Sequence, residues 1–251
     1  MRRALVTGAA GGLAAGIASA LASDGFDRLV ITYRNSSPDS TLAAIASANV
    51  AGVAACVDFS ANEGEIEDAL ASIVTEHGPF DTLVHAVGPI AIKRFSNLTS
   101  SDYREIFDGN VRSAVLAARA VLPAMREARF GRIVYFGSLG ANETRPYRGF
   151  SFYQAAKSAV IAFARCLALE EARHGVTVNV VVPGDIRRKS LSREAAREIA
   201  APNPLGRAGS YEDVADAVRF LIAPERDFIT GAVLDVTGGL TQADERNEPG
   251  S

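Results

Sequence analysis

The feature that most constrains the fold of this chain is a regular alternation of short apolar runs with longer segments of helical periodicity. The short runs have the length of strands, are rich in Val, Ile and Leu, and lack polar–apolar alternation, which suits strands buried on both faces. They cover residues 3–6, 29–33, 53–57, 82–86, 132–136, 176–182 and 232–236, and the clearest helical segments cover 12–23, 66–77, 111–129, 153–174 and 214–222. Strands that alternate with helices predict an α/β fold, a doubly wound parallel sheet with helices on both faces, in three layers.

The organisation along the chain predicts a single unit. With 251 residues, 48% of them hydrophobic, the chain can bury a sizeable core, and neither a linker nor an internal repeat interrupts it. We expect one domain over residues 1–242 and a loose polar tail over 243–251. Cys56 and Cys166 lie far apart in apolar surroundings, so we expect both to be buried free thiols of a protein in a reducing compartment.

Charge and hydropathy exclude several classes of partner. The formal net charge of -3 gives no basic excess for a nucleic-acid surface. The apolar stretch after Arg2 and Arg3 contains four glycines, unlike a signal-sequence helix, and no window approaches the ~20 apolar residues of a membrane span. The three histidines show no metal-ligand spacing, so we expect no metal site. These features predict a cytoplasmic protein that binds neither nucleic acid nor a membrane.

The first predicted strand runs into a glycine-rich turn, and a helix follows. This order is the context in which the pyrophosphate of a dinucleotide binds, and it points to a Rossmann fold. Gly8 permits the tight turn, Gly12 lets the backbone approach the phosphates, and the helix N-terminus offers free N–H groups. A packing role for these glycines alone is the alternative interpretation.

The end of the second predicted strand indicates which dinucleotide binds. An acidic residue at this place would bind the ribose 2′-hydroxyl of NAD, and none is present. Arg34 is present instead and can pair with the 2′-phosphate of NADP(H), although an incidental arginine in a solvated loop is the alternative. After the third strand, Asp58 can accept a hydrogen bond from an adenine amino group or can serve as a turn residue.

The candidate reacting centre joins a tyrosine to a lysine on one helical face. Tyr153 and Lys157 are four residues apart in a predicted helix. An ammonium group beside a phenol stabilises the phenolate and lowers the tyrosine pKa, which makes the phenol a usable acid–base. Ser138 follows the fifth strand at the carboxyl edge of the sheet, where such folds bind ligands, and Asn110 precedes the helix predicted from Val111. Taken singly, Tyr153 and Lys157 can be a surface pair, Ser138 a turn residue and Asn110 a helix cap.

Together, these residues resemble the short-chain dehydrogenase/reductase family over residues 3–240. The resemblance rests on several ordered motifs: Thr7, Gly8 and Gly12 in the turn, Asp58, the segment 83–88, Asn110, Ser138, Tyr153 with Lys157, the segment 178–184, and the closing segment from 229 to 239. The segment 204–209, followed by 212–215, is typical of members similar to 3-oxoacyl-[acyl-carrier-protein] reductases.

The resemblance implies a role for each residue of the site. Tyr153 is the general acid–base, Lys157 lowers its pKa and holds the nicotinamide ribose, Ser138 orients the substrate oxygen, and Asn110 supports a proton relay. It also implies seven parallel strands, a carbonyl substrate and a homotetramer or homodimer. The expected contacts with NADP(H) are Gly8, Gly12, Leu13, Arg34, Asp58, Phe59, Ala86, Gly88, Tyr153, Lys157, Pro183, Gly184 and Ile186.

Three positions depart from the family pattern. Ala14 replaces the third glycine of the turn, His85 and Ala86 replace two asparagines at the end of the fourth strand, and Arg188 replaces a threonine that often contacts the carboxamide. The altered fourth-strand motif keeps open reduction of a carbon–carbon double bond or a pterin on the same fold. A dinucleotide-binding sensor without catalysis is a further alternative, although the intact Ser138, Tyr153 and Lys157 set argues against it. Lysines and arginines in the expected substrate walls 89–95, 139–150 and 186–201 either meet an anionic carrier or are solvated.

Overall fold

The protein is built around one parallel sheet. The computed structural model describes residues 1–186 and 191–240. Seven strands pair in the order β3-β2-β1-β4-β5-β6-β7, and every pairing is parallel. The doubly wound sheet predicted from the sequence is therefore confirmed. The strands are β1 (Arg3–Thr7), β2 (Arg28–Tyr33), β3 (Ala51–Cys56), β4 (Thr82–His85), β5 (Gly131–Phe136), β6 (Val176–Pro183) and β7 (Val233–Val236).

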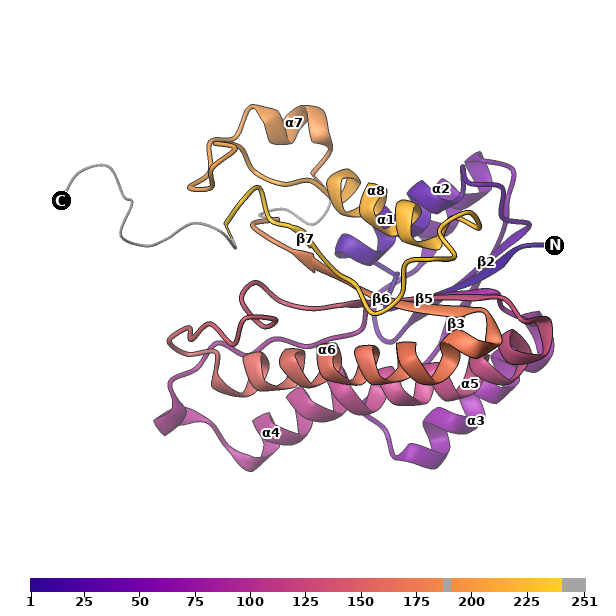
Figure 1. The fold of residues 1–251 in the computed structure, drawn as a ribbon, viewed down its shortest axis with the longest axis horizontal. Helices are drawn as coiled ribbons and strands as arrows, with labels where there is room; N and C mark the ends of the chain where they lie inside the picture. The colour runs from indigo at the N-terminus through magenta and orange to yellow at the C-terminus, as the bar shows by residue number, and fades with distance from the viewer. Residues whose placement is uncertain (187–190, 241–251) are drawn as a thin grey trace.

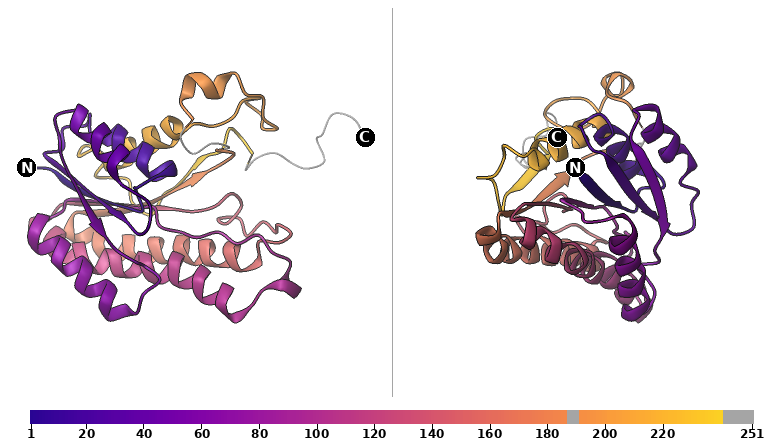
Figure 2. Two further views of the ribbon diagram at one scale, coloured as in Figure 1. Left: turned by 180° about the vertical axis from the view of Figure 1, so that it is seen from behind. Right: turned by 90° about the vertical axis from the view of Figure 1, so that its right-hand side faces the viewer.

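Helices cover both faces of the sheet and complete the three layers (Figure 1). On one face lie α1 (Gly12–Leu21), α2 (Asp39–Ser47) and α8 (Tyr211–Ile222); on the other lie α3 (Glu63–His77), α5 (Ser113–Ala128) and α6 (Ser151–Glu171). Seen from behind and from the side, the sheet stays between these two layers (Figure 2). Each layer closes its own apolar core against the sheet, because alternate residues of the buried strands point to opposite faces.

The sequence did not predict three helices: α2, α4 (Ser100–Phe107) and α7 (Arg193–Arg197). These helices are short and mostly exposed, so they carry little of the apolar periodicity on which sequence prediction depends. α4 instead begins with a local signal, a capping box in which Thr99 and Asp102 exchange side-chain and backbone hydrogen bonds. Short 3-10 turns occupy Phe95–Asn97 and Ala172–His174.

The start of α5 corrects the place expected for Asn110. The residue does not precede a helix beginning at Val111. It lies inside a π-helical turn, Asp108–Arg112, which continues α4 directly into α5, and α5 itself begins at Ser113. Such a turn widens the helix by one residue and is frequent at functional sites.

Both cysteines are free, but the expectation that they are buried is wrong. Cys56 ends β3 at the edge of the sheet, and Cys166 lies on the outer face of α6, so both are exposed. Within the described ranges, no helix is long and apolar enough to cross a membrane, and no cluster of three or more His, Cys, Asp or Glu side chains forms a metal site. The predicted tail 243–251 and Arg188 lie outside the described residues.

Candidate active site

The site begins where the direction of sheet winding reverses. β1 and β4 are neighbours in the sheet although two strands lie between them in sequence order, and ligands bind at this switch point in doubly wound folds. Gly8 follows β1 with a φ of +71°, a conformation that favours glycine, and a Cβ there would stand 3.2 Å from Val87. The glycine turn after β1 therefore packs directly on the end of β4.

A cleft of about 530 Å³ opens at this switch point. It is lined by six of the positions expected to bind the cofactor, which are Gly8, Gly12, Arg34, Phe59, Ala86 and Gly88. At its floor α1 begins without a side-chain cap and without an acidic residue in its first turn. Its first N–H groups therefore point toward the cleft with no side chain to satisfy them, which suits an anionic pyrophosphate.

Arg34 and Asp58 meet at the outer end of the cleft. Both side chains are about half exposed, and their charged atoms are 3.8 Å apart. Asp58 accepts hydrogen bonds from the Ser60 backbone N–H at 2.9 Å and from the Ser60 hydroxyl at 2.6 Å. These bonds hold the pKa of the Asp58 carboxyl below its usual value. Asp58 thus has partners within its own turn, and its contact with adenine stays a prediction; Ser60, which the sequence did not single out, lines the cleft.

Tyr153 lies in the first turn of α6, and its hydroxyl is hydrogen-bonded to the side chain of Ser138, two residues beyond β5. Burial raises the pKa of Tyr153, while the bond from Ser138 opposes that rise. The Lys157 ammonium was expected to lower this pKa, but it stands 5.8 Å from the centre of the Tyr153 ring, and burial decides the balance in the protein alone. Ser138 and Tyr153 are thus joined by a hydrogen bond, and the lowering of the Tyr153 pKa by Lys157 stays a prediction.

Lys157 is buried under the same edge of the sheet. Its Nζ donates to the carbonyl oxygen of Phe136 at 2.9 Å, and burial lowers its pKa to about 8. A Cβ on Gly88 would stand 2.9 Å from this Nζ and 2.6 Å from Oδ1 of Asn110. The glycine at the end of the β4 segment thus leaves the space in which the lysine and the asparagine approach each other.

Asn110 projects from the π-helical turn toward that space. Its Nδ2 donates to the carbonyl oxygens of Pro89 and Ile106, each at 2.9 Å, which fixes the amide plane. Its Oδ1 is buried and has no hydrogen-bond partner among the residues that the structure describes. A buried amide oxygen without a partner requires a water or a ligand group to satisfy it.

The remaining predicted cofactor positions lie outside the cleft. Leu13 packs with the core under α1, and Asp58 is described above. Gly184 donates its N–H to the carbonyl of Val236 on β7, and a Cβ there would stand 2.6 Å from Thr237. Pro183 and Ile186 flank this turn, and Ile186 packs against Gly209.

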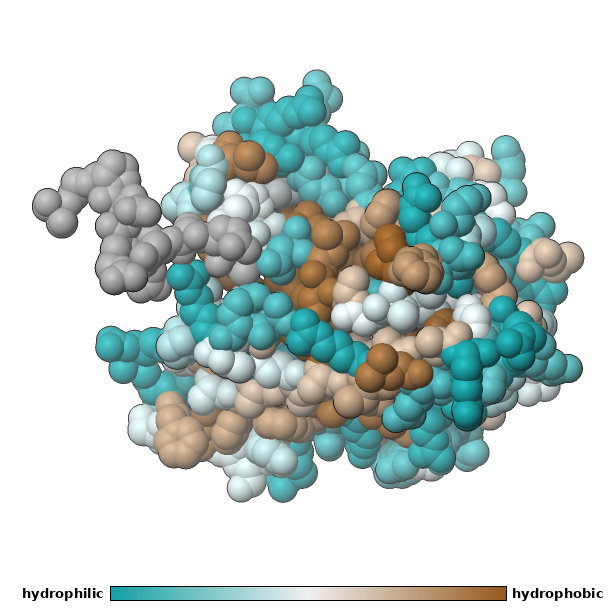
Figure 3. All heavy atoms as spheres, viewed as in Figure 1, coloured by the Kyte–Doolittle hydropathy of each residue, from teal (hydrophilic) through white to brown (hydrophobic). Residues whose placement is uncertain are grey.

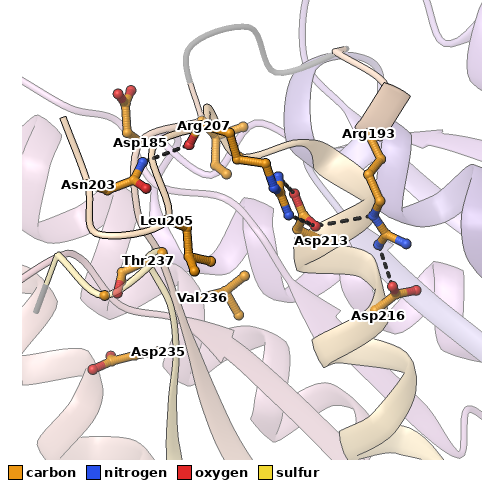
Figure 4. Close-up of a pocket in the computed structure, with 14 residues that line it drawn as sticks. Asp185, Arg193, Asn203, Leu205, Arg207, Asp213, Asp216, Asp235, Val236 and Thr237 are labelled. Atoms are coloured by element: carbon orange, nitrogen blue, oxygen red, sulfur yellow. Dashed lines mark hydrogen bonds and ion pairs between the residues drawn. The ribbon is translucent and has the colours of Figure 1, made fainter. Parts of the chain in front are cut away.

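A second cavity, of about 470 Å³, lies between the ends of β6 and β7 and the segment 203–216 (Figure 4). In it Asp213 accepts hydrogen bonds from Arg207 and Arg193, and it closes a capping box with Ser210 at the start of α8. Burial alone would raise the pKa of Asp213, but the bonds from Arg207 and Ser210 outweigh it and hold the pKa below its usual range. Tyr153 is not among the lining residues, and Arg207 of the characteristic segment 204–209 is bonded to Asp213 at the start of α8.

From the sequence, His85 was only a departure from the family pattern, but in the structure its ring has definite hydrogen-bond partners. The ring is 3% exposed, with Nδ1 2.9 Å from Oγ1 of Thr7 and Nε2 3.0 Å from Oγ of Ser113. Nothing in the local sequence marks Ser113 as a partner, because it reaches His85 only through the π-helical turn. The expected basic substrate wall is also modified, since Lys93 forms an ion pair with Asp102 at 2.6 Å.

Fold and site together define a dinucleotide-dependent oxidoreductase. A family model described as "Enoyl-(Acyl carrier protein) reductase" matches residues 8–241. The 3-oxoacyl-[acyl-carrier-protein] reductase FabG of Escherichia coli K12 is 35% identical over 240 residues, which is 94% of this chain and 96% of that protein. The chain belongs to the short-chain dehydrogenase/reductase family, whose members use NAD(P)H, and it is an oxidoreductase acting on the carbonyl–alcohol pair.

Other relatives carry related activities on the same fold. The subunit BbsC of (2S)-[(R)-hydroxy(phenyl)methyl]succinyl-CoA dehydrogenase from Thauera aromatica is 35% identical over 192 residues, covering 75% of this chain and 74% of that one. The structure of acetoin dehydrogenase YohF from Salmonella typhimurium has a TM-score of 0.88 at 27% identity and covers 98% of this chain and 100% of its own. A variant actinorhodin polyketide ketoreductase with NADPH has a TM-score of 0.85 at 30% identity, over 96% of this chain and 98% of its own.

Proposed function

We propose that this protein reduces a ketone with NADPH, with Tyr153 as the general acid, and that its substrate is a 3-oxoacyl thioester or a similar carbonyl compound. The observation that carries the proposal is the hydrogen bond between Ser138 and Tyr153 at the carboxyl edge of the sheet, beside the buried Lys157. The thioester is inferred from the names of relatives such as FabG and BbsC.

The residues of the cleft fit a nicotinamide dinucleotide. The uncapped start of α1 suits the pyrophosphate, and Arg34 lies at the outer end of the cleft, where the 2′-phosphate of NADPH would need a positive charge. No acidic side chain is among the cleft-lining residues of β2 and its loop. When bound, the reduced cofactor supplies the hydride that the carbonyl carbon accepts.

The chain's own residues handle the charge that develops on the substrate oxygen. Ser138 donates a hydrogen bond toward that oxygen and Tyr153 delivers its proton, so the carbonyl becomes an alcohol. A raised pKa suits Tyr153 for this direction, because it keeps the phenol protonated until the oxygen becomes basic. The unpaired Oδ1 of Asn110 supports a water between Asn110 and Lys157, through which Tyr153 regains its proton.

A spectrophotometric panel tests the activity. NADPH oxidation is followed with acetoacetyl thioesters, diketones, quinones, pterins and enoyl thioesters. We expect the 3-oxo compounds to be reduced. Turnover of enoyl thioesters or pterins in place of every ketone would assign the alternative chemistry, and NADPH binding without turnover of any compound would favour the sensor.

Substitution of the tyrosine tests its role. Tyr153→Phe keeps the ring and removes the ionisable hydroxyl, so we expect a loss of turnover of about 100- to 10,000-fold with unchanged NADPH affinity. Lys157→Ala should weaken both turnover and NADPH binding, because we propose that Lys157 also holds the nicotinamide ribose. Binding is read from NADPH fluorescence, which no tryptophan of this chain complicates. Near-normal turnover by Tyr153→Phe would refute the assignment.

A further inference from the structure

A chain of hydrogen bonds crosses the sheet at His85. One end begins at the Ala86 N–H, which donates to Oγ1 of Thr7 at 3.1 Å. The Thr7 hydroxyl lies 2.9 Å from Nδ1 of His85, and Nε2 lies 3.0 Å from the Ser113 hydroxyl. Ser113 in turn donates to the carbonyl oxygen of Gly109 at 2.6 Å. The chain therefore runs from β1, through β4, to the π-helical turn.

The partners fix the direction of every bond in this chain. Ser113 has one hydroxyl hydrogen, which it gives to Gly109, so its oxygen accepts from His85 and Nε2 carries the proton. Thr7 accepts from the Ala86 N–H and gives its own hydrogen to Nδ1. A neutral imidazole protonated on Nε2 satisfies all of these groups, whereas a charged ring would leave Thr7 facing a second donor.

The surroundings hold the ring in this orientation. Phe59 and Tyr135 contact it edge to face, with ring centres 5.7 and 5.9 Å away. Burial and, to a smaller extent, the nearby Lys157 ammonium together lower the His85 pKa to about 3. Tyr135, the other titratable group against the ring, has a raised pKa because it is buried too. The ring is therefore neutral near neutral pH.

The two ends of the chain hold different residues of the proposed site, of which Gly109 also lines the cleft. The Thr7 end precedes Gly8 and fixes the Ala86 N–H beside the dinucleotide cleft. The Ser113 end holds Gly109, the neighbour of Asn110, within the π-helical turn. The imidazole is long enough to reach both ends, since its two nitrogens lie on opposite sides of the ring.

We propose that His85 is a positioning residue that couples the cofactor cleft to the turn carrying Asn110, through a fixed Nε2-protonated imidazole. His85 touches neither substrate nor cofactor in this proposal. The hydrogen bond at Nδ1 (the Nδ1 arm) positions the backbone beside the cleft, and the hydrogen bond at Nε2 (the Nε2 arm) positions the turn that carries Asn110. Only the expected effect on kcat rests on the proposed function.

Two amide substitutions separate the arms. An asparagine amide lies near the position of Nδ1, and a glutamine amide lies near that of Nε2. His85→Asn should keep NADPH affinity and lower kcat, and His85→Gln should do the reverse, each by about tenfold, since each leaves a buried hydrogen-bonding group without its partner. His85→Phe keeps a flat ring and should lose both properties. Ser113→Ala removes the Nε2 partner together with the hydrogen bond to Gly109 and should match His85→Asn in direction.

The positioning role of His85 can still be tested if one variant does not fold. Melting followed by circular dichroism identifies folded variants, and Ser113→Ala is the smallest change in the set. Equal effects of His85→Asn and His85→Gln on kcat and NADPH affinity, or an unchanged His85→Phe, would show that His85 only fills space.

A spectroscopic test is independent of turnover. In ¹⁵N-histidine spectra of the full-length protein, assigned by comparison with His85→Phe, His85 should show the Nε2–H tautomer and no titration where a free histidine titrates. A proton on Nδ1, or a titrating ring, would overturn the proposal. If the wild-type protein reduces no carbonyl compound, the proposed function fails, while the tautomer and the NADPH affinities still decide the role of His85.

Discussion

The ion pair between Arg34 and Asp58 does not by itself account for the presence of Arg34. Its guanidinium is 3.8 Å from the Asp58 carboxylate, and the two side chains are 58% and 47% exposed. Exposed pairs of this kind contribute almost nothing to stability. Asp58 is in any case held by Ser60. Arg34 can therefore exchange Asp58 for a ligand phosphate, which offers more charge and closer geometry.

Cofactor preference should depend on Arg34. NADPH should bind tighter than NADH, and Arg34→Ala should lower NADPH affinity about tenfold, because a charge-assisted bond to phosphate is lost. NADH affinity should hardly change. Arg197→Ala removes an exposed arginine from α7 and serves as the control for net charge. Fluorescence titration measures the affinity of each of the three proteins for both cofactors, and equal binding of NADPH and NADH by the wild-type protein would contradict the assignment.

The burial of Lys157 has a consequence for stability. Its pKa falls from a usual 10.5 to about 8, so between these values the unfolded chain binds more protons than the folded one, and stability rises with pH. Below pH 8 both states hold the proton, and the cost of burying the ammonium is present in full. Lys157→Met lacks this titration. As the pH rises from about 8 to 10.5, the unfolding free energy of the wild-type protein should therefore increase by up to about 3 kcal/mol relative to that of Lys157→Met.

Urea denaturation of both cofactor-free proteins, near neutral pH and near the upper end of this window, measures the shift. The raised pKa values of Tyr135 and Tyr153 act the opposite way above the usual tyrosine value of 10.0, but both proteins contain these tyrosines. A difference between the two proteins that did not vary with pH would mean that the folded state keeps the Lys157 amine solvated.

At the scale of elements, the sequence predicted what depends on long apolar patterns. The strands were found because their residues are buried on both faces, and the glycine turn because its chemistry is local. The short helices α2, α4 and α7 were missed, since they present few buried residues. The expected start at Val111 was wrong because a π-helical turn merges two helices without a break in periodicity that a sequence reveals.

The site was predicted less evenly than the fold. Ser138, Tyr153 and Lys157 were identified through family motifs, and the structure brings them together at one sheet edge. Burial could not be read from their spacing, and in the protein alone it raises the pKa of Tyr153. The contact between His85 and Ser113 joins elements 28 residues apart and depends on the exact path of the π-helical turn, which no local pattern encodes.

Gly88, which follows β4, lies so close to the π-helical turn that we expect no side-chain atom to be accepted there. Gly88→Ala would place a Cβ 2.6 Å from Oδ1 of Asn110 and 2.9 Å from Nζ of Lys157. Displacing either group typically costs about 1–3 kcal/mol, so we expect a lower melting temperature and a severe loss of turnover. Gly64→Ala is the control, because its Cβ would meet the nearest side chain at an ordinary 3.6 Å. A fully active Gly88→Ala would contradict this packing.

At the scale of the whole molecule, all described helices and strands belong to one layered unit around one sheet. This supports the proposal of a single domain. The unit nevertheless leaves apolar surface outside its two cores. Figure 3 shows brown and pale spheres in the strip between α8 and α6, where β7 forms the edge of the sheet. On the outer face of α6, Ala162 and Cys166 are exposed, and Leu169 is 81% exposed.

These surfaces lead us to expect self-association. A long helix with one face on the sheet and a second apolar face is suited to pack against its copy about a two-fold axis, and repetition of such contacts gives a dimer or a tetramer. Light scattering at micromolar concentration should therefore show a homotetramer or a homodimer. Leu169→Glu places a charge on the outer face of α6 near its C-terminal end and should shift the protein to a smaller species. Ala71→Glu, on the exposed face of α3, adds the same charge away from that contact and should leave the assembly intact. A monomeric wild-type protein, or equal effects of the two substitutions, would show that α6 is not the interface.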